Sequence, residues 1–140
     1  MPIIAWLIVI FLASSDMMSA EHTSRFIGPF LRWLIPDISG PTIVSIQLFV
    51  RKAAHVTEYA ILGALLMRAF THGNVRLSWR HVAAAWLVAV SCASLDEFHQ
   101  SFVASRTGSP IDVTIDVFGA VCGLALYWML ARRKLGPGAS

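Results

Sequence analysis

The chain has 140 residues, of which 56% are hydrophobic and 14% are charged, and its mean hydropathy is +0.66. Soluble domains carry about 25% charged residues, so this composition predicts one small integral membrane domain; a soluble bundle of buried helices would need polar outer faces that the apolar runs lack. The formal charge of +3 does not indicate nucleic acid, because the basic residues border apolar runs as they do in membrane proteins.

Apolar runs predict an all-α bundle that crosses the membrane with four helices, since one crossing needs about 20 residues. The expected helices cover residues 2–20, 42–70, 82–102 and 111–131, approximately, and residues 136–140 form a disordered tail. The first helix is the weakest candidate. Its continuous apolar run covers only residues 3–13, and polar residues 14–16 follow.

Between the first two spans, residues 21–40 predict an amphipathic segment that lies at the membrane surface. Phe30 and Trp33 stand beside Arg25 and Arg32, and aromatic and basic side chains together suit the headgroup region. A plain connecting loop is the alternative interpretation of this segment.

The second helix carries its polar residues in one half only. Residues three or four apart share a helix face, so these side chains define two adjoining stripes. One stripe contains Lys52, His55, Tyr59 and Gly63, and the other contains Arg51, His55 and Glu58.

The last two helices place further polar groups on either side of a turn. Asp96, Glu97 and Gln100 end the third helix, and Arg106 lies in the turn. On the fourth helix one stripe contains Asp112, Asp116, Gly119 and Gly123. The last two of these form a G-x-x-x-G pattern, which permits close helix contact in lipid.

The distribution of charge predicts the orientation. The connection between the second and third helices and the C-terminal end carry basic residues and no acid, whereas all eight acidic residues belong to the opposite side. Because Lys and Arg in short loops favour the cytoplasm, both termini are expected to be cytoplasmic in the inner membrane. The basic residues of the cytoplasmic side are Arg68, Arg76, Arg80, Arg132, Arg133 and Lys134.

Charged groups in hydrocarbon are costly, so the polar residues of the outer half are expected to converge on one site. A histidine with two or more carboxylates suits acid–base chemistry, and Lys and Arg suit an anionic headgroup of a polyprenyl phosphate or glycolipid. The candidate catalytic residues are His55, Asp96, Glu97 and Asp116. The candidate substrate-binding residues are Arg51, Lys52, Glu58, Tyr59, Gln100, Arg106 and Asp112.

Other interpretations of the same cluster stay open. It could be a network that only fixes helix packing, the site of a non-catalytic envelope factor or scaffold, or the relay of a proton-coupled transporter. No metal site is predicted, because no H-E-x-x-H motif or thiol cage is present, although a hard ion held by carboxylates is an alternative. The sequence specifies no cofactor, oligomeric state or reaction, and leaves open whether the protein is an enzyme.

These motifs, in this order, resemble the VanZ-like family of small bacterial membrane proteins. The resemblance rests on Lys52-x-x-His55-x-x-x-Tyr59 with Gly63 and Leu65, on Asp96-Glu97-x-x-Gln100-x-Phe102 with Arg106, on Asp112 and Asp116-x-x-Gly119, and on Ser14-Ser15. One departure is Ala104-Ser105, where the family pattern commonly has Pro-Gly. The resemblance implies a protein of the bacterial cell envelope and a connection with resistance to the glycopeptide teicoplanin, but it implies no established reaction.

Overall fold

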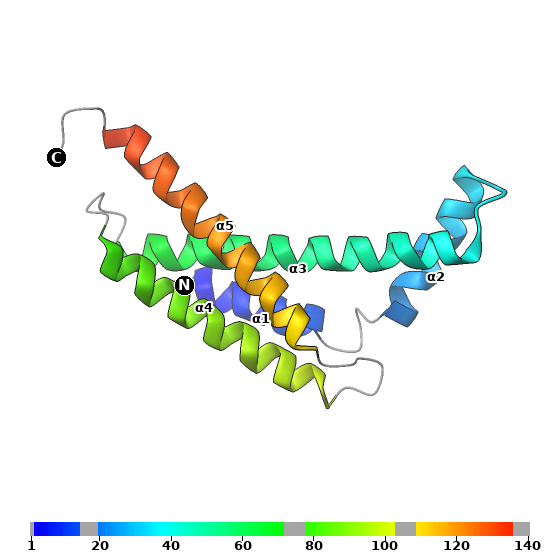
Figure 1. Cartoon of the computed structure of the whole chain (residues 1–140), viewed down its shortest axis with the longest axis horizontal. Coiled ribbons are helices and arrows are strands. Elements are labelled where there is room, and N and C mark those ends of the chain that lie inside the picture. The colour runs from blue at the N-terminus through cyan, green and yellow to red at the C-terminus, as the bar shows by residue number, and fades with distance from the viewer. Residues whose placement is uncertain (1, 15–19, 72–77, 103–108, 136–140) are drawn as a thin grey trace.

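A computed structural model describes residues 2–14, 20–71, 78–102 and 109–135 (Figure 1). These residues form helices without strands, so the predicted all-α class is confirmed. The expected tail 136–140 and the turn that contains Arg106 lie outside the described residues. The helices are α1 (Pro2–Ser14), α2 (Ala20–Leu34), α3 (Gly40–Phe70), α4 (Trp79–Gln100) and α5 (Pro110–Leu135).

Local sequence signals set the starts of the two central helices. The Ser39 side chain accepts a hydrogen bond from the Thr42 N–H at 3.3 Å, and a proline stands in the first turn of α3. The Ser78 side chain accepts one from the Arg80 N–H at 3.3 Å. Both are N-caps of the kind that serine provides. They make α3 and α4 begin a few residues before the predicted starts at 42 and 82.

Successive helices of the bundle run in alternating directions. In Figure 1, α1 and α4 run from left to right, whereas α3 and α5 run from right to left. The chain therefore has the same general direction in α3 and α5, although the two helix axes cross at an angle. The core lies where these helices meet and includes the fully buried Tyr59, Leu62 and Met67 of α3. Ala85 and Ala89 continue it at four-residue spacing on α4, which indicates that small side chains let this helix approach closely.

The α3–α5 contact is the most extensive in the bundle, and glycine makes it possible. A Cβ atom on Gly63 would lie 2.5 Å from the Ala120 carbonyl oxygen, and one on Gly119 would lie 2.5 Å from the Val56 carbonyl oxygen. A Cβ atom on Gly123 would overlap the Ala60 carbonyl group. The close helix contact predicted from the G-x-x-x-G spacing is therefore present.

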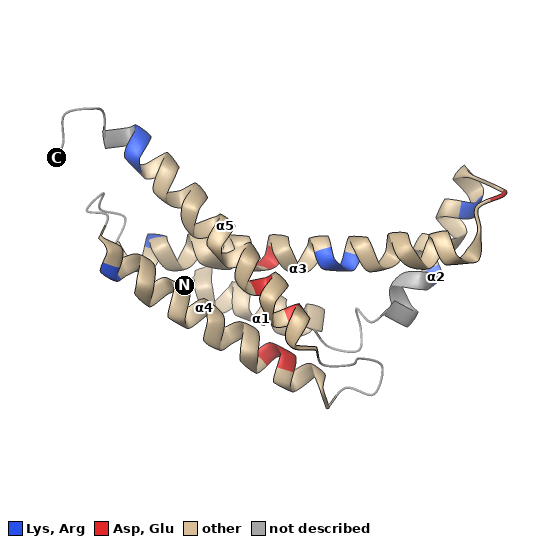
Figure 2. Cartoon of the chain, in the orientation of Figure 1, with Lys and Arg blue, Asp and Glu red and all other residues tan. Residues whose placement is uncertain are grey.

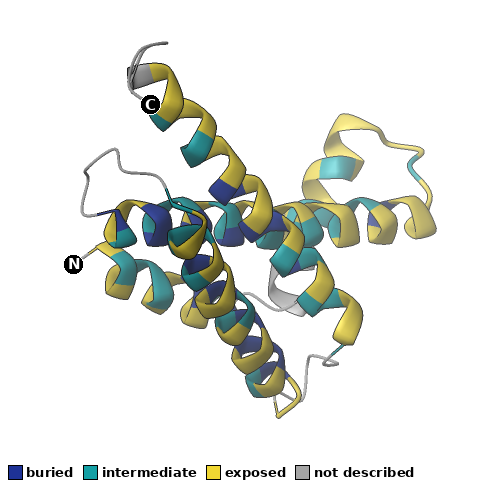
Figure 3. Cartoon of the chain, turned by 60° about the vertical axis from the view of Figure 1, so that its left-hand side comes forward, coloured by how far each residue is buried: buried dark blue, intermediate teal, exposed yellow. Residues whose placement is uncertain are grey.

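Two of the described helical stretches, Trp79–Gln100 and Pro110–Arg133, are long and apolar enough to cross a membrane. In the most apolar part of each stretch, only 28% of the residues are buried inside the molecule. Most of these side chains are therefore not buried, as in a membrane protein (Figure 3). The apolar α1 is described for 13 residues, short of the predicted 2–20, because residues 15–19 lie outside the description and Ala20 belongs to α2. Crossings by α1 and α3 remain predictions.

The segment between α1 and α3 contains a helix, not a plain connecting loop. α2 packs against the first part of α3, away from the place where α3 crosses α5 (Figure 1). Phe26 and Trp33 of α2 are 78% and 77% exposed, and Arg25 and Arg32 are also exposed. The segment is thus helical and presents aromatic and basic groups, while its position at a membrane surface remains a prediction.

Charge is divided between the two ends of the bundle. Figure 2 shows Lys and Arg, without Asp or Glu, among the described residues where α3 ends, α4 begins and α5 ends. The acidic residues of α3, α4 and α5 lie closer to the opposite end. The division by side that the sequence predicts is therefore present in the fold.

Candidate functional site

A buried polar cluster lies where α1, α3, α4 and α5 meet. Asp116 and Ser14 have no exposed surface, and Gln100 and Asp96 are almost completely buried. His55 is 13% exposed at its side chain. Each helix of the bundle core thus contributes to one polar centre, as expected if polar groups inside a membrane gather to satisfy one another.

Asp96 is the centre of the hydrogen bonds in this cluster. Its Oδ2 accepts a hydrogen bond from the Ser14 hydroxyl at 2.7 Å and another from the Gln100 side-chain amide at 3.0 Å. Gln100 Nε2 also lies 3.4 Å from Ser14 Oγ. Asp96 and Gln100 therefore share one face of α4, as predicted, and that face fastens the end of α1 to the bundle.

His55 and Asp116 form the second part of the cluster, between α3 and α5. His55 Nδ1 lies 3.2 Å from Asp116 Oδ1. The two groups do not have the direction of a hydrogen bond, and among the described residues neither His55 Nδ1 nor either carboxylate oxygen of Asp116 has a hydrogen-bond partner. The pair is therefore an electrostatic contact.

Lys52 and Asp112 form an ion pair at the border of the cluster. They lie one helical turn from His55 and Asp116 respectively, because residues three or four apart share a helix face. The Lys52 side chain is 35% exposed and that of Asp112 is 16% exposed. The two predicted polar stripes of α3 and α5 therefore face each other, and their outer pair can be reached from outside.

The remaining predicted site residues take different positions. Glu97 is buried and its Oε1 accepts a hydrogen bond from the Ser109 N–H, so its described contact is with the start of α5. Tyr59 is fully buried and its hydroxyl has no hydrogen-bond partner. Arg51 and Glu58 are half-buried. Arg106 lies outside the described residues.

Ser14 belongs to the cluster but is not among the site residues predicted from the sequence. It is one of the residues on which the family resemblance rests, and a serine that ends an apolar run is a usable signal. Its partners, Asp96 and Gln100, are 82 and 86 residues away in the chain, and no periodicity within one helix predicts such a contact.

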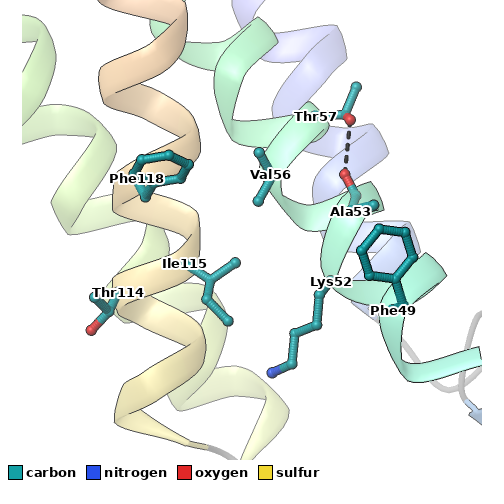
Figure 4. A pocket seen from close by; sticks show the side chains of 8 residues that line it. All are labelled: Phe49, Lys52, Ala53, Val56, Thr57, Thr114, Ile115 and Phe118. Carbon is teal, nitrogen blue, oxygen red and sulfur yellow. Dashed lines mark hydrogen bonds between the residues drawn. The ribbon is translucent and has the colours of Figure 1, made fainter. Parts of the chain in front are cut away.

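A groove of about 690 Å³ runs between α3 and α5 beside this cluster. Figure 4 shows Phe49, Val56 and Phe118 along it and Lys52 directed toward the end at which α5 begins. The Thr57 hydroxyl donates to the Ala53 carbonyl of its own helix at 2.8 Å. Lys52 is the charged residue among those that line the groove, so the groove is apolar along its length and cationic at one end.

Comparison with known proteins identifies the family. The family model described as VanZ/LLP1 matches residues 1–131, nearly the whole chain, so the chain belongs to this family. The comparisons with curated proteins and with solved structures found no match.

Proposed function

We propose that this VanZ/LLP1 protein binds a phosphate-bearing lipid of the bacterial envelope, of the polyprenyl-phosphate or glycolipid class, in the groove between α3 and α5. The observation that carries the proposal is the form of this groove, which is apolar along its walls and has the Lys52 ammonium at one end. Its volume of about 690 Å³ lies within the range of about 300 to 1,000 Å³ that is usual for ligand sites.

The two ends of such a lipid match the two parts of the groove. The hydrocarbon chain would pack against Val56 and against Phe49 and Phe118, both of which are exposed. The phosphate would accept charge-assisted hydrogen bonds from Lys52, which are about twice as strong as neutral ones. Lys52 is paired with Asp112 in the free protein, so the phosphate would replace a carboxylate partner that already holds the ammonium in position.

The buried cluster gives this site the means for acid–base chemistry on the bound headgroup. His55 lies one helical turn from Lys52, and its electrostatic contact with Asp116 would stabilise the protonated imidazole during proton transfer. We assign His55 the role of proton donor or acceptor and Asp116 that of its electrostatic partner. Asp96, held by Ser14 and Gln100, would serve as the second carboxylate.

Substitution of Lys52 tests lipid binding. Lys52→Gln is expected to weaken retention of a polyprenyl phosphate by about 10- to 100-fold, since losing a hydrogen bond to a charged group costs about 1.5–3 kcal/mol. Native mass spectrometry of the detergent-purified protein would measure bound polyprenyl phosphate against the uncharged polyprenol. Arg68→Gln, at the opposite end of α3, is the matched control and should bind as the wild type does. Equal retention of phosphate and alcohol by the wild type would contradict the proposal.

The proposed location is the cytoplasmic membrane of a bacterium, with α1, α3, α4 and α5 crossing it and both termini in the cytoplasm. The alternating directions of these helices and the division of charge between their ends support this arrangement. It places the start of α5, Lys52 and the buried cluster toward the outer leaflet, where the headgroup of a bound envelope lipid would lie.

Cysteine labelling tests this orientation. In a background with Cys92→Ala and Cys122→Ala, Ser109→Cys is expected to react with a membrane-impermeant thiol reagent in intact cells, and Gly73→Cys is expected to react only after the cells are opened. Position 73 precedes α4 in the chain and position 109 follows it, so each position serves as the control for the other. The reverse labelling pattern would overturn the topology.

The family resemblance supports a connection with teicoplanin. An envelope lipid held on the outer face of the membrane is in the compartment where a glycopeptide acts. We therefore expect that expression of this protein in a susceptible Gram-positive host raises the teicoplanin concentration that prevents growth. An unchanged inhibitory concentration at full membrane expression would remove this part of the proposal without affecting lipid binding.

A further inference from the structure

We infer that His55, Asp96 and Asp116 hold a divalent metal ion at the centre of the bundle. One ligand atom from each of these residues lies within 4.8 Å of those of the other two. The residues come from α3, α4 and α5, so a single ion would join the three helices. These are the side chains to which the proposed function assigns acid–base roles, but binding of the ion requires no lipid and can be measured separately.

Buried polar atoms that make no hydrogen bond among the described residues point to a ligand between His55, Asp96 and Asp116. Asp116 has no exposed surface, yet in the part of the chain that the structure describes neither of its carboxylate oxygens has a hydrogen-bond partner. A buried polar group left in this way is costly, and an ion bound between the helices would remove the cost. The buried aspartate is therefore the observation that distinguishes this cluster from an ordinary group of acidic residues.

The geometry of the His55–Asp116 pair fits two ligands of one ion better than a hydrogen bond. Nδ1 and Oδ1 are 3.2 Å apart but are not aligned as donor and acceptor. Adjacent ligands with metal bonds of about 2.1 Å are separated by roughly 3.0 to 3.4 Å. The observed separation of 3.2 Å falls within that interval.

Asp96 has the supporting contacts that metal ligands usually have. Its Oδ2 accepts hydrogen bonds from Ser14 and Gln100, neither of which goes to Oδ1. Such outer contacts fix the orientation of a ligating carboxylate, and their loss typically lowers metal affinity by about 10- to 100-fold. Ser14 and Gln100 would thus be positioning residues for the ion.

Charge favours a divalent cation over an empty site. Two carboxylates, Asp96 and Asp116, are buried together with a single histidine, and the nearby Lys52 is already paired with Asp112. A doubly charged ion neutralises both aspartates. One imidazole nitrogen and two carboxylate oxygens suit a first-row ion such as Zn²⁺ or Mn²⁺, since imidazole favours zinc-type ions and carboxylate favours manganese-type ions.

A titration of the full chain in detergent, without lipid, tests the inference. Protein stripped with a chelator is titrated with Mn²⁺, and the free ion is followed by electron paramagnetic resonance. We expect saturable binding of one Mn²⁺ per chain, displaced by Zn²⁺. His55→Gln and Asp116→Asn should each weaken binding at least about tenfold, and Ser14→Ala should weaken it while leaving all three ligands in place.

Asp37→Asn is the matched control, because Asp37 is an exposed carboxylate in the α2–α3 connection and should not change the titration. A variant is compared with the wild type only if it is monodisperse by gel filtration and still helical. Absence of saturable binding by the wild type, or unchanged binding by folded His55→Gln and Asp116→Asn, would overturn the inference. The lipid proposal would stand in that case, because retention of a polyprenyl phosphate is measured separately.

Discussion

The Gly123→Ala substitution is expected to lower the free energy of unfolding by about 3 kcal/mol, at the upper end of the range for overpacked cores. A Cβ atom at this position overlaps the carbonyl group of Ala60 on the facing helix. Because the clash is with backbone, no side-chain rotation can relieve it, and α3 and α5 must move apart. The loss outweighs the gain of about 0.5–1 kcal/mol that alanine normally provides over glycine inside a helix.

Other glycines of the chain make this a graded test. Gly63→Ala should destabilise the protein less than Gly123→Ala, since its Cβ would lie 2.5 Å from the Ala120 carbonyl oxygen. Gly40→Ala has no atom within 4 Å and should leave the stability unchanged or slightly higher. Thermal unfolding in detergent, followed by tryptophan fluorescence, gives the order. Equal effects at positions 123 and 40 would contradict the α3–α5 contact.

Much of this contact could be predicted from the sequence, because it depends on the spacing of residues within single helices. The stripe of Lys52, His55, Tyr59 and Gly63 and the stripe of Asp112, Asp116, Gly119 and Gly123 each follow from the helical repeat. Because charge in hydrocarbon is costly, the polar residues of these helices are expected to converge. The structure pairs Lys52 with Asp112 and His55 with Asp116, in agreement with that expectation.

Other features could not be predicted, because they depend on how separate helices are rotated and placed against one another. Ser14 reaches Asp96 across 82 residues, and the helical repeat contains no information about such a distance. Glu97 is next to Asp96 in the chain, yet its described contact is with Ser109 at the start of α5. The sequence therefore predicts which residue types gather in the outer half of the bundle better than it predicts which of them share a centre.

The second prediction concerns Asp96, where one substitution of similar size should destabilise the fold and another should leave its stability nearly unchanged. Asp96→Leu is expected to lower the free energy of unfolding by about 2–4 kcal/mol, because the buried hydrogen bonds from Ser14 and Gln100 lose their acceptor and each lost partner costs about 1–3 kcal/mol. Asp96→Asn keeps an acceptor oxygen in the same place, so its stability should lie within about 1 kcal/mol of the wild type. Thermal unfolding in detergent measures both.

Because Asp96→Asn keeps the fold and removes the charge, it separates the interpretations of the cluster. A network that only fixes packing would leave every function intact in this variant. A binding protein would keep both lipid retention and its effect on teicoplanin tolerance, since the headgroup contact is made by Lys52 and not by Asp96. An enzyme that needs the second carboxylate would retain the lipid but lose its effect on teicoplanin tolerance in cells. If Asp96 takes part in proton transfer, the rate of the reaction would fall by a factor of about 10² or more.

We expect the last of these outcomes, for a reason that lies in the burial of the site. A network that serves packing alone is no more stable than apolar side chains of similar volume would be, and the neighbouring contacts of α4 are made by alanines that pack without polar groups. Burying Asp96, Asp116 and His55 in the middle of an otherwise apolar bundle costs stability, so we expect that their charges serve a function. Unchanged teicoplanin tolerance in cells that express folded Asp96→Asn and His55→Gln would show that the charges serve no such purpose.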